Sequence, residues 1–219
     1  MKIITLIIIT FLIISDYSSV TKINYLPENY FPKSRLCQND NPIVSYFPLS
    51  SFYLNKKNNK VADEYIETLV FEASKMLFKA NEPIICTHHI NNDVYRYVGI
   101  TEGGQKIIRL IKKKNNIEVI IKYIKKNNNF NYFKEKEKNY FISTLYIDTL
   151  KSIINKYDLR KMNLFTAWSS GNHEQYFLEG YDKAGYFVIE NSGFSNPEYA
   201  KINRIIREYF HKIEMLLQK

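Results

Sequence analysis

The chain has 219 residues, of which 45% are hydrophobic and 15% aromatic. This composition excludes a generally disordered protein and is enough for one sizeable domain. The net charge of +9 would suit an anionic partner. However, Lys is abundant together with Asn, Ile, Tyr and Phe, as an AT-rich genome would encode, and few of the lysines surround a motif. We therefore do not expect nucleic-acid binding.

Residues 1–19 have the pattern of a signal peptide. Lys2 is followed by an unbroken apolar run, Ile3–Ile14, which is too short for an ordinary transmembrane helix. Cleavage after Ser15 or Ser19 fits the small polar residues that follow, although an uncleaved anchor stays an alternative because the Ala-x-Ala pattern is absent. No later segment is apolar enough to span a membrane. We expect an exported protein, periplasmic or secreted.

Residues 20–60 predict an irregular arm. Four prolines, Pro27, Pro32, Pro42 and Pro48, stand among aromatic residues. Repeated proline interrupts helices and weakens strands, so neither element is expected here. The aromatic residues favour an arm that packs on the domain.

The remaining residues, 61–219, predict a single α+β domain. Apolar residues at three- and four-residue steps predict the helices, and short apolar runs separated by Gly or Asn turns predict the strands. The element order is α-β-β-β-β-α-β-β-α, which favours a mainly antiparallel sheet with the helices packed on one face. The predicted helices are 61–80, 143–157 and the segment from Pro197 onward. The predicted strands are 94–100, 105–112, 117–125, 132–140 and a hairpin within 166–194, with 84–88 as a further short strand.

The apolar stripes of the last two helices mark the side chains that we expect to face the sheet. In the helix at 143–157, which Ser143 is expected to cap, they are Leu145, Ile147, Leu150, Ile153 and Ile154. In the final helix they are Ile202, Ile205, Ile206, Tyr209, Ile213, Leu216 and Leu217.

The two cysteines allow two interpretations. Cys86 and His88 belong to the densest group of potential metal ligands and would share a face of a strand. A structural zinc site needs a second pair of ligands, which the sequence lacks, so we expect no metal and no cofactor. Cys37 and Cys86 could instead form a disulfide after export, since two cysteines are too few for a disulfide scaffold.

The stretch Thr166–Phe194 contains residue types that hydrolases use. His173 and Glu174 follow two serines and a glycine, but the Gly-x-Ser-x-Gly pattern is absent, and catalytic triads usually come from distant parts of a chain. We favour a polar loop that enters a strand. His173, Glu174 and Glu179 remain the candidates of a rival hydrolase interpretation.

Glu179 lies on an apolar strand of this hairpin and needs a cation or a raised pKa. A three-residue turn would place it beside Phe187 and Ile189, whereas a four-residue turn would place it with Val188 and Glu190.

Two arginines interrupt apolar rows in other strands, as buried partners of a carboxylate would. Arg109 shares a strand face with Ile107, and Arg96 shares one with Val98. We predict an ion pair between Glu179 and Arg109, or failing that Arg96. Such a pair would fix the register of the sheet and need not catalyse anything.

Several motifs follow one another between residue 93 and the C-terminus: Tyr95-Arg96-Tyr97, Ile108-Arg109-Leu110, a helix after Ser143, Gln175–Gly180, Gly185–Val188 and Pro197. In this order they resemble a widespread family of exported bacterial proteins of unknown function, with an Asp-Gly-x-x-Trp-x-Leu-Glu-Gly strand followed by Gly-x-Tyr-His-x-Val. This chain departs from the family pattern at three places. It has Tyr176 in place of the Trp, Asn172-His173 in place of Asp-Gly, and Phe187 in place of the His. The resemblance implies export and an α+β fold, and it implies no activity.

Together these patterns favour a non-enzymatic protein that binds another macromolecule. Its most concrete form is an inhibitor or immunity-type protein whose partner is a protein of the cell envelope. One rival is a hydrolase that uses the hairpin at 172–190. The other is a cationic protein on anionic surfaces, which would gather its lysines on one face, namely Lys112–Lys114, Lys122, Lys125 and Lys126.

Overall fold

The structure is a computed structural model that describes residues 46–47, 60–86, 92–101, 104–127, 132–161, 175–191 and 197–218. The predicted signal peptide and nearly all of the predicted arm lie outside these residues. The helical elements are α2 (Lys60–Lys79), α3 (Leu145–Lys156), the 3₁₀ turn η4 (Leu159–Lys161) and α4 (Pro197–Leu216). The strands are β1 (Val94–Thr101), β2 (Gly104–Lys112), β3 (Ile117–Lys126), β4 (Tyr132–Ile142), β5 (Gln175–Asp182) and β6 (Gly185–Asn191).

The six strands form one sheet in the order β4-β3-β2-β1-β5-β6. Every neighbouring pair is antiparallel, which confirms the α+β class and the predicted order of elements. The lysine- and glutamate-rich strand β4 is an edge strand, where such charges discourage pairing with other chains.

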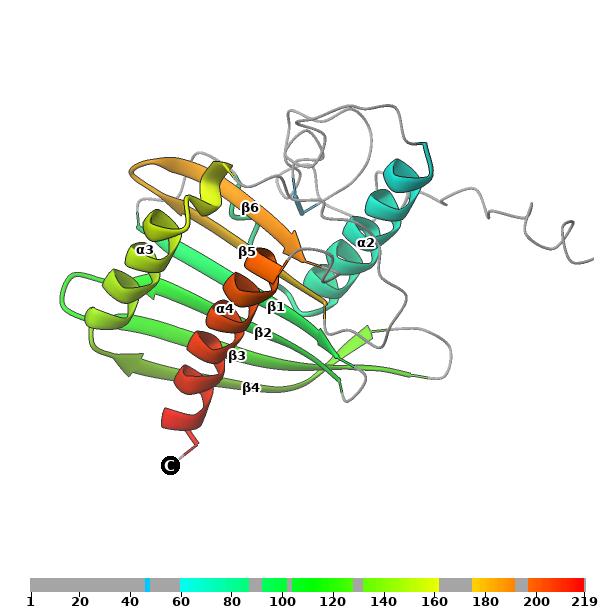
Figure 1. The fold of residues 1–219 in the computed structure, drawn as a ribbon. Coiled ribbons are helices and arrows are strands. Elements are labelled where there is room, and N and C mark those ends of the chain that lie inside the picture. Colours follow the sequence, from blue (N-terminus) through cyan, green and yellow to red (C-terminus); the bar gives the residue numbers. More distant parts are fainter. Residues whose placement is uncertain are drawn as a thin grey trace, which may run out of the picture.

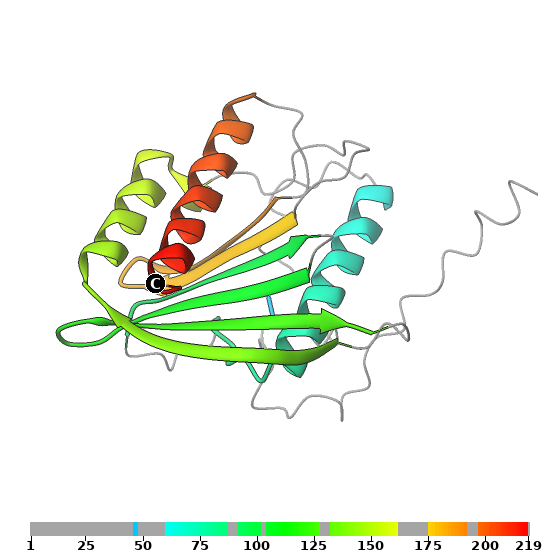
Figure 2. The same ribbon diagram turned by 90° about the horizontal axis from the view of Figure 1, so that it is seen from below.

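The helices lie on both faces of the sheet instead of the one face that we expected (Figures 1 and 2). Helices α3 and α4 cover one face, where the Phe210 ring of α4 stacks on Tyr97 with 4.6 Å between centroids. Helix α2 covers the opposite face, where Met76 and Leu77 belong to the same buried cluster as Ile107. Both faces need a cover because the central strands are apolar on both sides.

Two sequence predictions differ in detail from the structure. Residues Ile84, Ile85 and Cys86 form no strand; Ile84 and Ile85 are buried in a bent segment after α2, while His88 lies outside the described residues. Pro83 directly precedes them and cannot donate a ladder hydrogen bond. Helix α3 begins at Leu145 with Thr144 in the N-cap position, one residue after the predicted Ser143. The Ser143 hydroxyl accepts a hydrogen bond from the Leu145 amide at 3.3 Å.

The ends of the two helical stripes also differ from the prediction. Leu145 at the start of α3 is 67% exposed, and Leu216 at the end of α4 is 43% exposed. Both leucines were expected to face the sheet. Phe210, by contrast, is fully buried although it was not assigned to the stripe.

Gly180 of β5 lies between two aromatic rings. A Cβ atom at this position would lie 2.5 Å from Cε1 of Phe187 and 2.6 Å from Cδ1 of Tyr95. We expect Gly180→Ala to lower the free energy of unfolding by about 1–3 kcal/mol, because both rings would have to move within a packed core. Urea unfolding measures this change. An unchanged midpoint at an unchanged slope would show that the rings move without cost.

Candidate functional site

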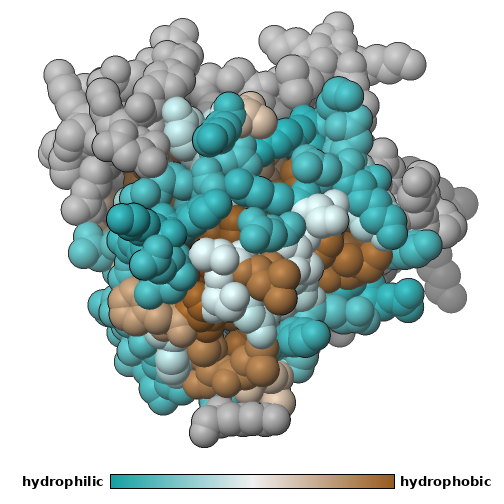
Figure 3. Space-filling view, turned by 90° about the vertical axis from the view of Figure 1, so that its left-hand side faces the viewer, coloured by the Kyte–Doolittle hydropathy of each residue, from teal (hydrophilic) through white to brown (hydrophobic). Residues whose placement is uncertain are grey.

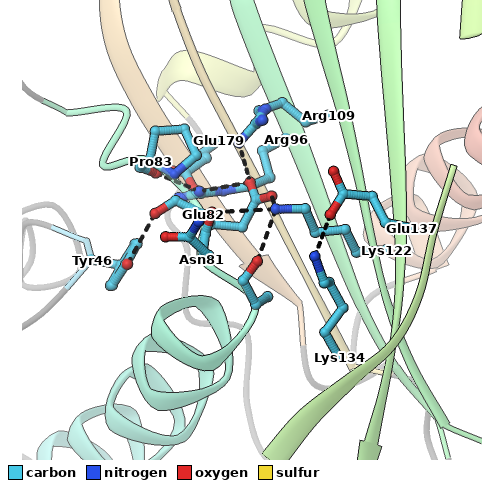
Figure 4. Close-up of polar contacts among 11 residues, drawn as sticks. Tyr46, Asn81, Glu82, Pro83, Arg96, Arg109, Lys122, Lys134, Glu137 and Glu179 are labelled. Carbon is cyan, nitrogen blue, oxygen red and sulfur yellow. Dashed lines mark hydrogen bonds and ion pairs between the residues drawn. The ribbon is translucent and has the colours of Figure 1, made fainter. Parts of the chain in front are cut away.

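Five charged side chains are buried together between the sheet and the end of α2 (Figure 4). Arg96, Arg109, Lys122 and Glu179 come from β1, β2, β3 and β5, and Glu82 comes from the segment that follows α2. Glu82, Arg96 and Glu179 are each no more than 1% exposed. We call these five residues the buried charge cluster.

The register of the sheet explains why the strand residues meet. Arg96 lies opposite Arg109 on β2 and opposite Glu179 on β5, so all three point to the same face. Lys122 follows on the same face of β3, opposite Glu137 of the edge strand β4. Charged positions on neighbouring strands therefore share the face of the sheet that α2 covers, although Lys122 is opposite Ile107 and not Arg109.

Glu82 reaches these residues because of the way in which α2 ends. Asn81 has a positive φ of 53°, and the Glu82 amide donates to the carbonyl of Leu77 at 3.0 Å. A left-handed residue followed by this six-to-one hydrogen bond is a Schellman C-cap, which reverses the chain direction. The reversal directs the Glu82 carboxylate back toward the sheet.

Glu82 is the centre of the buried charge cluster. Its Oε2 accepts hydrogen bonds from NH1 of Arg109 at 2.7 Å and from NH1 of Arg96 at 3.3 Å. Its Oε1 lies 2.7 Å from Nζ of Lys122. Lys122 also donates to the carbonyl of Ala80 at 2.8 Å, at the C-terminal end of α2, where the helix dipole favours a cation.

Glu179 is bound from two sides. Nε of Arg96 donates to its Oε1 at 2.6 Å, and the Tyr186 hydroxyl donates to its Oε2 at 3.0 Å. NH1 of Arg96 also donates to the Pro83 carbonyl at 2.7 Å. The Tyr46 ring lies 5.7 Å from the guanidinium carbon of Arg96. Each oxygen of the carboxylate therefore accepts from a neighbouring side chain.

The structure thus selects between the two arginines that the sequence offered. Arg96 contacts Glu179, whereas Arg109 contacts Glu82. The β5–β6 turn has two residues, with Asp182 opposite Gly185, which is shorter than either predicted loop. It places Glu179 opposite Val188.

Burial and charge act against each other in the buried charge cluster. Burial lowers the pKa of Arg96, but Glu179 and Glu82 outweigh it, so the pKa lies above its ordinary value. For Arg109, burial together with the charge of Arg96 outweighs Glu82 and lowers the pKa. Burial likewise raises the pKa of Glu179 despite Arg96 and Tyr186. Three cations against two carboxylates leave one excess positive charge.

Glu137, on the edge strand beside the buried charge cluster, partly offsets this excess positive charge. Its carboxylate accepts a hydrogen bond from Lys134 at 2.6 Å, and its side chain is exposed on β4. The Lys134 hydrogen bond lowers the pKa of Glu137, and the charges of Lys122 and Arg109 contribute in the same direction.

A second polar group fastens the β5–β6 turn to η4. Asp182 accepts hydrogen bonds from the Tyr95 hydroxyl at 2.5 Å and from NH2 of Arg160 at 2.6 and 2.7 Å. Burial raises the pKa of Asp182, but these partners and the Ala184 amide outweigh it and hold the pKa below its usual range. Arg160 also lies over the Phe187 ring, 4.6 Å from its centroid.

Of the other predicted site residues, the structure describes Cys86 alone. His173, Glu174, His88 and Cys37 lie outside the described residues, so the rival catalytic set and the predicted disulfide stay predictions. Cys86 is half-buried beyond Pro83. In the part of the chain that the structure describes, no group of three His, Cys, Asp or Glu side chains could hold a metal ion.

The sequence patterns did not single out Glu82, and they assigned Lys122 only to a possible cationic face. Glu82 directly precedes Pro83 and belongs to no periodic apolar pattern. Lys122 could have been found, because it interrupts the apolar row of Ile120 and Ile124 on β3 as the arginines interrupt theirs. The arrangement as a whole ties four strands and the end of α2 together through charge pairs, which is a structural role.

Comparison with known proteins gives no match to any protein family or to any curated protein. The resemblance to a family of exported bacterial proteins therefore stays a prediction. Among the described residues, no helix combines the length and the apolar character that crossing a membrane requires.

Proposed function

We propose that the protein is exported and then binds another protein without catalysing a reaction, as an inhibitor or immunity-type protein of the cell envelope would. The observation that carries this proposal is a group of large apolar side chains left exposed at one end of the molecule. They are Phe141 on β4, Leu145 on α3, and Met215 and Leu216 on α4, between 43% and 67% exposed. We call these four residues the corner surface.

The corner surface lies where β4 ends, α3 begins and α4 ends, and Figures 1 and 2 show these three ends close together. Seen from that side, apolar side chains gather across the middle and lower part of the molecule (Figure 3). Half-buried Tyr140 and Ile142 on β4, Tyr146 on α3 and Leu217 just after α4 pack against the core. Contiguous exposed apolar surface on a folded domain marks an interaction site.

The state of Glu179 argues against the hydrolase interpretation. A catalytic carboxylate must reach its substrate, whereas Glu179 is fully buried and both of its oxygens accept hydrogen bonds from Arg96 and Tyr186. Breaking a buried pair of this kind to free the carboxylate would cost much of the stability of a domain of this size.

The pairing of the lysines argues against a general cationic surface. Lys122 is buried against Glu82, and the other predicted lysines except Lys114 have an acidic neighbour. Those pairs are Lys112 with Asp93, Lys113 with Glu118, Lys125 with Glu135 and Lys126 with Glu72. Much of the positive charge is thus neutralised locally.

Fractionation of the producing cells tests the proposal. We expect the chain in the envelope fraction or the medium, shortened by a mass that corresponds to cleavage after Ser15 or Ser19. We also expect it to elute from a size-exclusion column in a complex with a second protein. A full-length chain in the cytoplasm, or hydrolysis of a substrate that Glu179→Gln abolishes without unfolding the chain, would contradict it.

A further inference from the structure

We propose that the corner surface binds an acidic protein whose contact region wraps round the end of strand β4. This inference rests on the proposed function and specifies the surface and the chemistry of the partner. It follows from the shape of the corner surface and from the charges around it.

The shape favours a protein over a membrane. Phe141 lies opposite Glu118 in the register and therefore belongs to the sheet face that α2 covers. Met215 and Leu216 belong to α4, which covers the other face. The apolar side chains thus extend from both faces of the sheet at its edge. A bilayer meets a protein along one plane, whereas a protein partner can follow a corner.

The charges around the corner surface favour an acidic partner. Lys114, Lys138 and Lys212 have no ion pair within the part of the chain that the structure describes. Lys138 precedes Phe141 by three residues on β4, and Lys212 precedes Leu216 by one helical turn. Three acidic residues lie nearby. Glu214, next to Met215, is buried and paired with Lys106, and Glu118, opposite Phe141, is paired with Lys113. Asp148 lies one turn after Leu145. The charged side chains without an ion pair around the corner surface, which we call its rim, are therefore mainly positive.

A positive rim around an apolar centre is complementary to apolar side chains surrounded by Asp and Glu. A second copy of this chain would bring two positive rims together, which like-charge repulsion disfavours. The occupant that fits both shape and charge is a different protein with an acidic surface.

Photo-crosslinking in the producing cells tests this inference. The full chain carries benzoylphenylalanine in place of Phe141, and a matched chain carries it in place of Phe133. Phe133 is also exposed on β4 but lies near the other end of the strand, eight residues before Phe141. We expect position 141 to give an adduct with one protein, identified by mass spectrometry as acidic, and position 133 to give none.

Charge reversal tests the nature of the contact. We expect Lys138→Glu combined with Lys212→Glu to lower the yield of the adduct at least tenfold, roughly the effect of losing a few rim charges on association. Lys201→Glu on the first half of α4, an exposed lysine away from the corner surface, should leave the yield unchanged. Equal loss in both variants would overturn the assignment of the rim.

Other adducts would overturn the inference in distinguishable ways. An adduct with a second copy, with a basic protein, or equally from position 133 would refute the acidic partner at this surface while leaving protein binding intact. Binding to vesicles of phosphatidylcholine and phosphatidylglycerol in equal parts that Phe141→Ser with Leu145→Ser abolishes would assign the surface to membranes. If neither position, nor a general lysine-reactive crosslinker, gives any protein adduct, the proposed function itself fails.

Discussion

Replacing Glu82 with Gln should lower the free energy of unfolding by about 3–5 kcal/mol. The carboxylate of Glu82 lies within 3.3 Å of three cations, namely Arg96, Arg109 and Lys122. An amide of the same shape removes the charge that compensates them and leaves Glu179 as the remaining acid of the buried charge cluster. Like charges without a counter-ion repel strongly in a low-dielectric interior. This repulsion raises the free energy of the folded state and so lowers the free energy of unfolding.

A matched control separates burial from the loss of a glutamate. Glu72 on α2 accepts hydrogen bonds from Lys126 at 3.3 Å and from Tyr132 at 2.7 Å, but its side chain is 33% exposed. We expect Glu72→Gln to cost under about 1 kcal/mol, because water screens this pair. Urea unfolding of both variants with equal slopes measures the difference. Similar losses in the two variants would contradict a central role for Glu82.

Arg96→Met should also cost about 3–5 kcal/mol, for the opposite reason. It leaves Glu179 buried with Tyr186 as its remaining donor, and it leaves the Pro83 carbonyl without the hydrogen bond from Arg96. Methionine keeps the length and apolar character of the arginine stem, so lost packing contributes little.

Adding Glu179→Leu to Arg96→Met should recover most of the lost stability. Replacing both partners of a buried pair with apolar side chains of similar volume is often neutral, because no uncompensated charge is left. Glu82 keeps Arg109 and Lys122 in this double variant. A double variant no more stable than the single one would contradict the pairing of Arg96 with Glu179.

The sequence was informative where a charged residue interrupts an apolar row. On β5 and β1 the alternation of side chains places Glu179 and Arg96 inside the domain, and burial without a partner is too costly. The cost of burial predicts a partner for Glu179 but does not select Arg96 over Arg109. The selection depends on Glu82, whose position follows from the left-handed backbone of Asn81 and not from any periodic pattern.

The sequence could not predict which face of the sheet each helix covers or which apolar residues stay exposed, because periodicity does not show what a helix packs against. Strands that are apolar on both faces need helices on both sides, yet the helix patterns do not say which helix covers which face. Leu145 and Leu216 continue apolar stripes and were expected inside the domain. Each lies at an end of its helix and is exposed. The spacing of the apolar residues is the same whether a helix packs on the sheet along its whole length or extends beyond the sheet at one end.

The exposure of these two leucines bears on function. A sequence that keeps apolar residues beyond the core leaves them in water, which is costly unless another surface covers them. We infer that the buried charge cluster holds the domain together and that the corner surface meets the partner.

The yield of the position-141 adduct in the Arg96→Met and Glu179→Leu double variant tests this division most directly. Circular dichroism and urea unfolding establish first that the double variant is folded. We expect the same adduct, in unchanged yield, as from the chain with the buried charge cluster intact. A folded double variant that no longer captures the partner would show that the buried charges take part in function, which contradicts a purely structural role for the buried charge cluster.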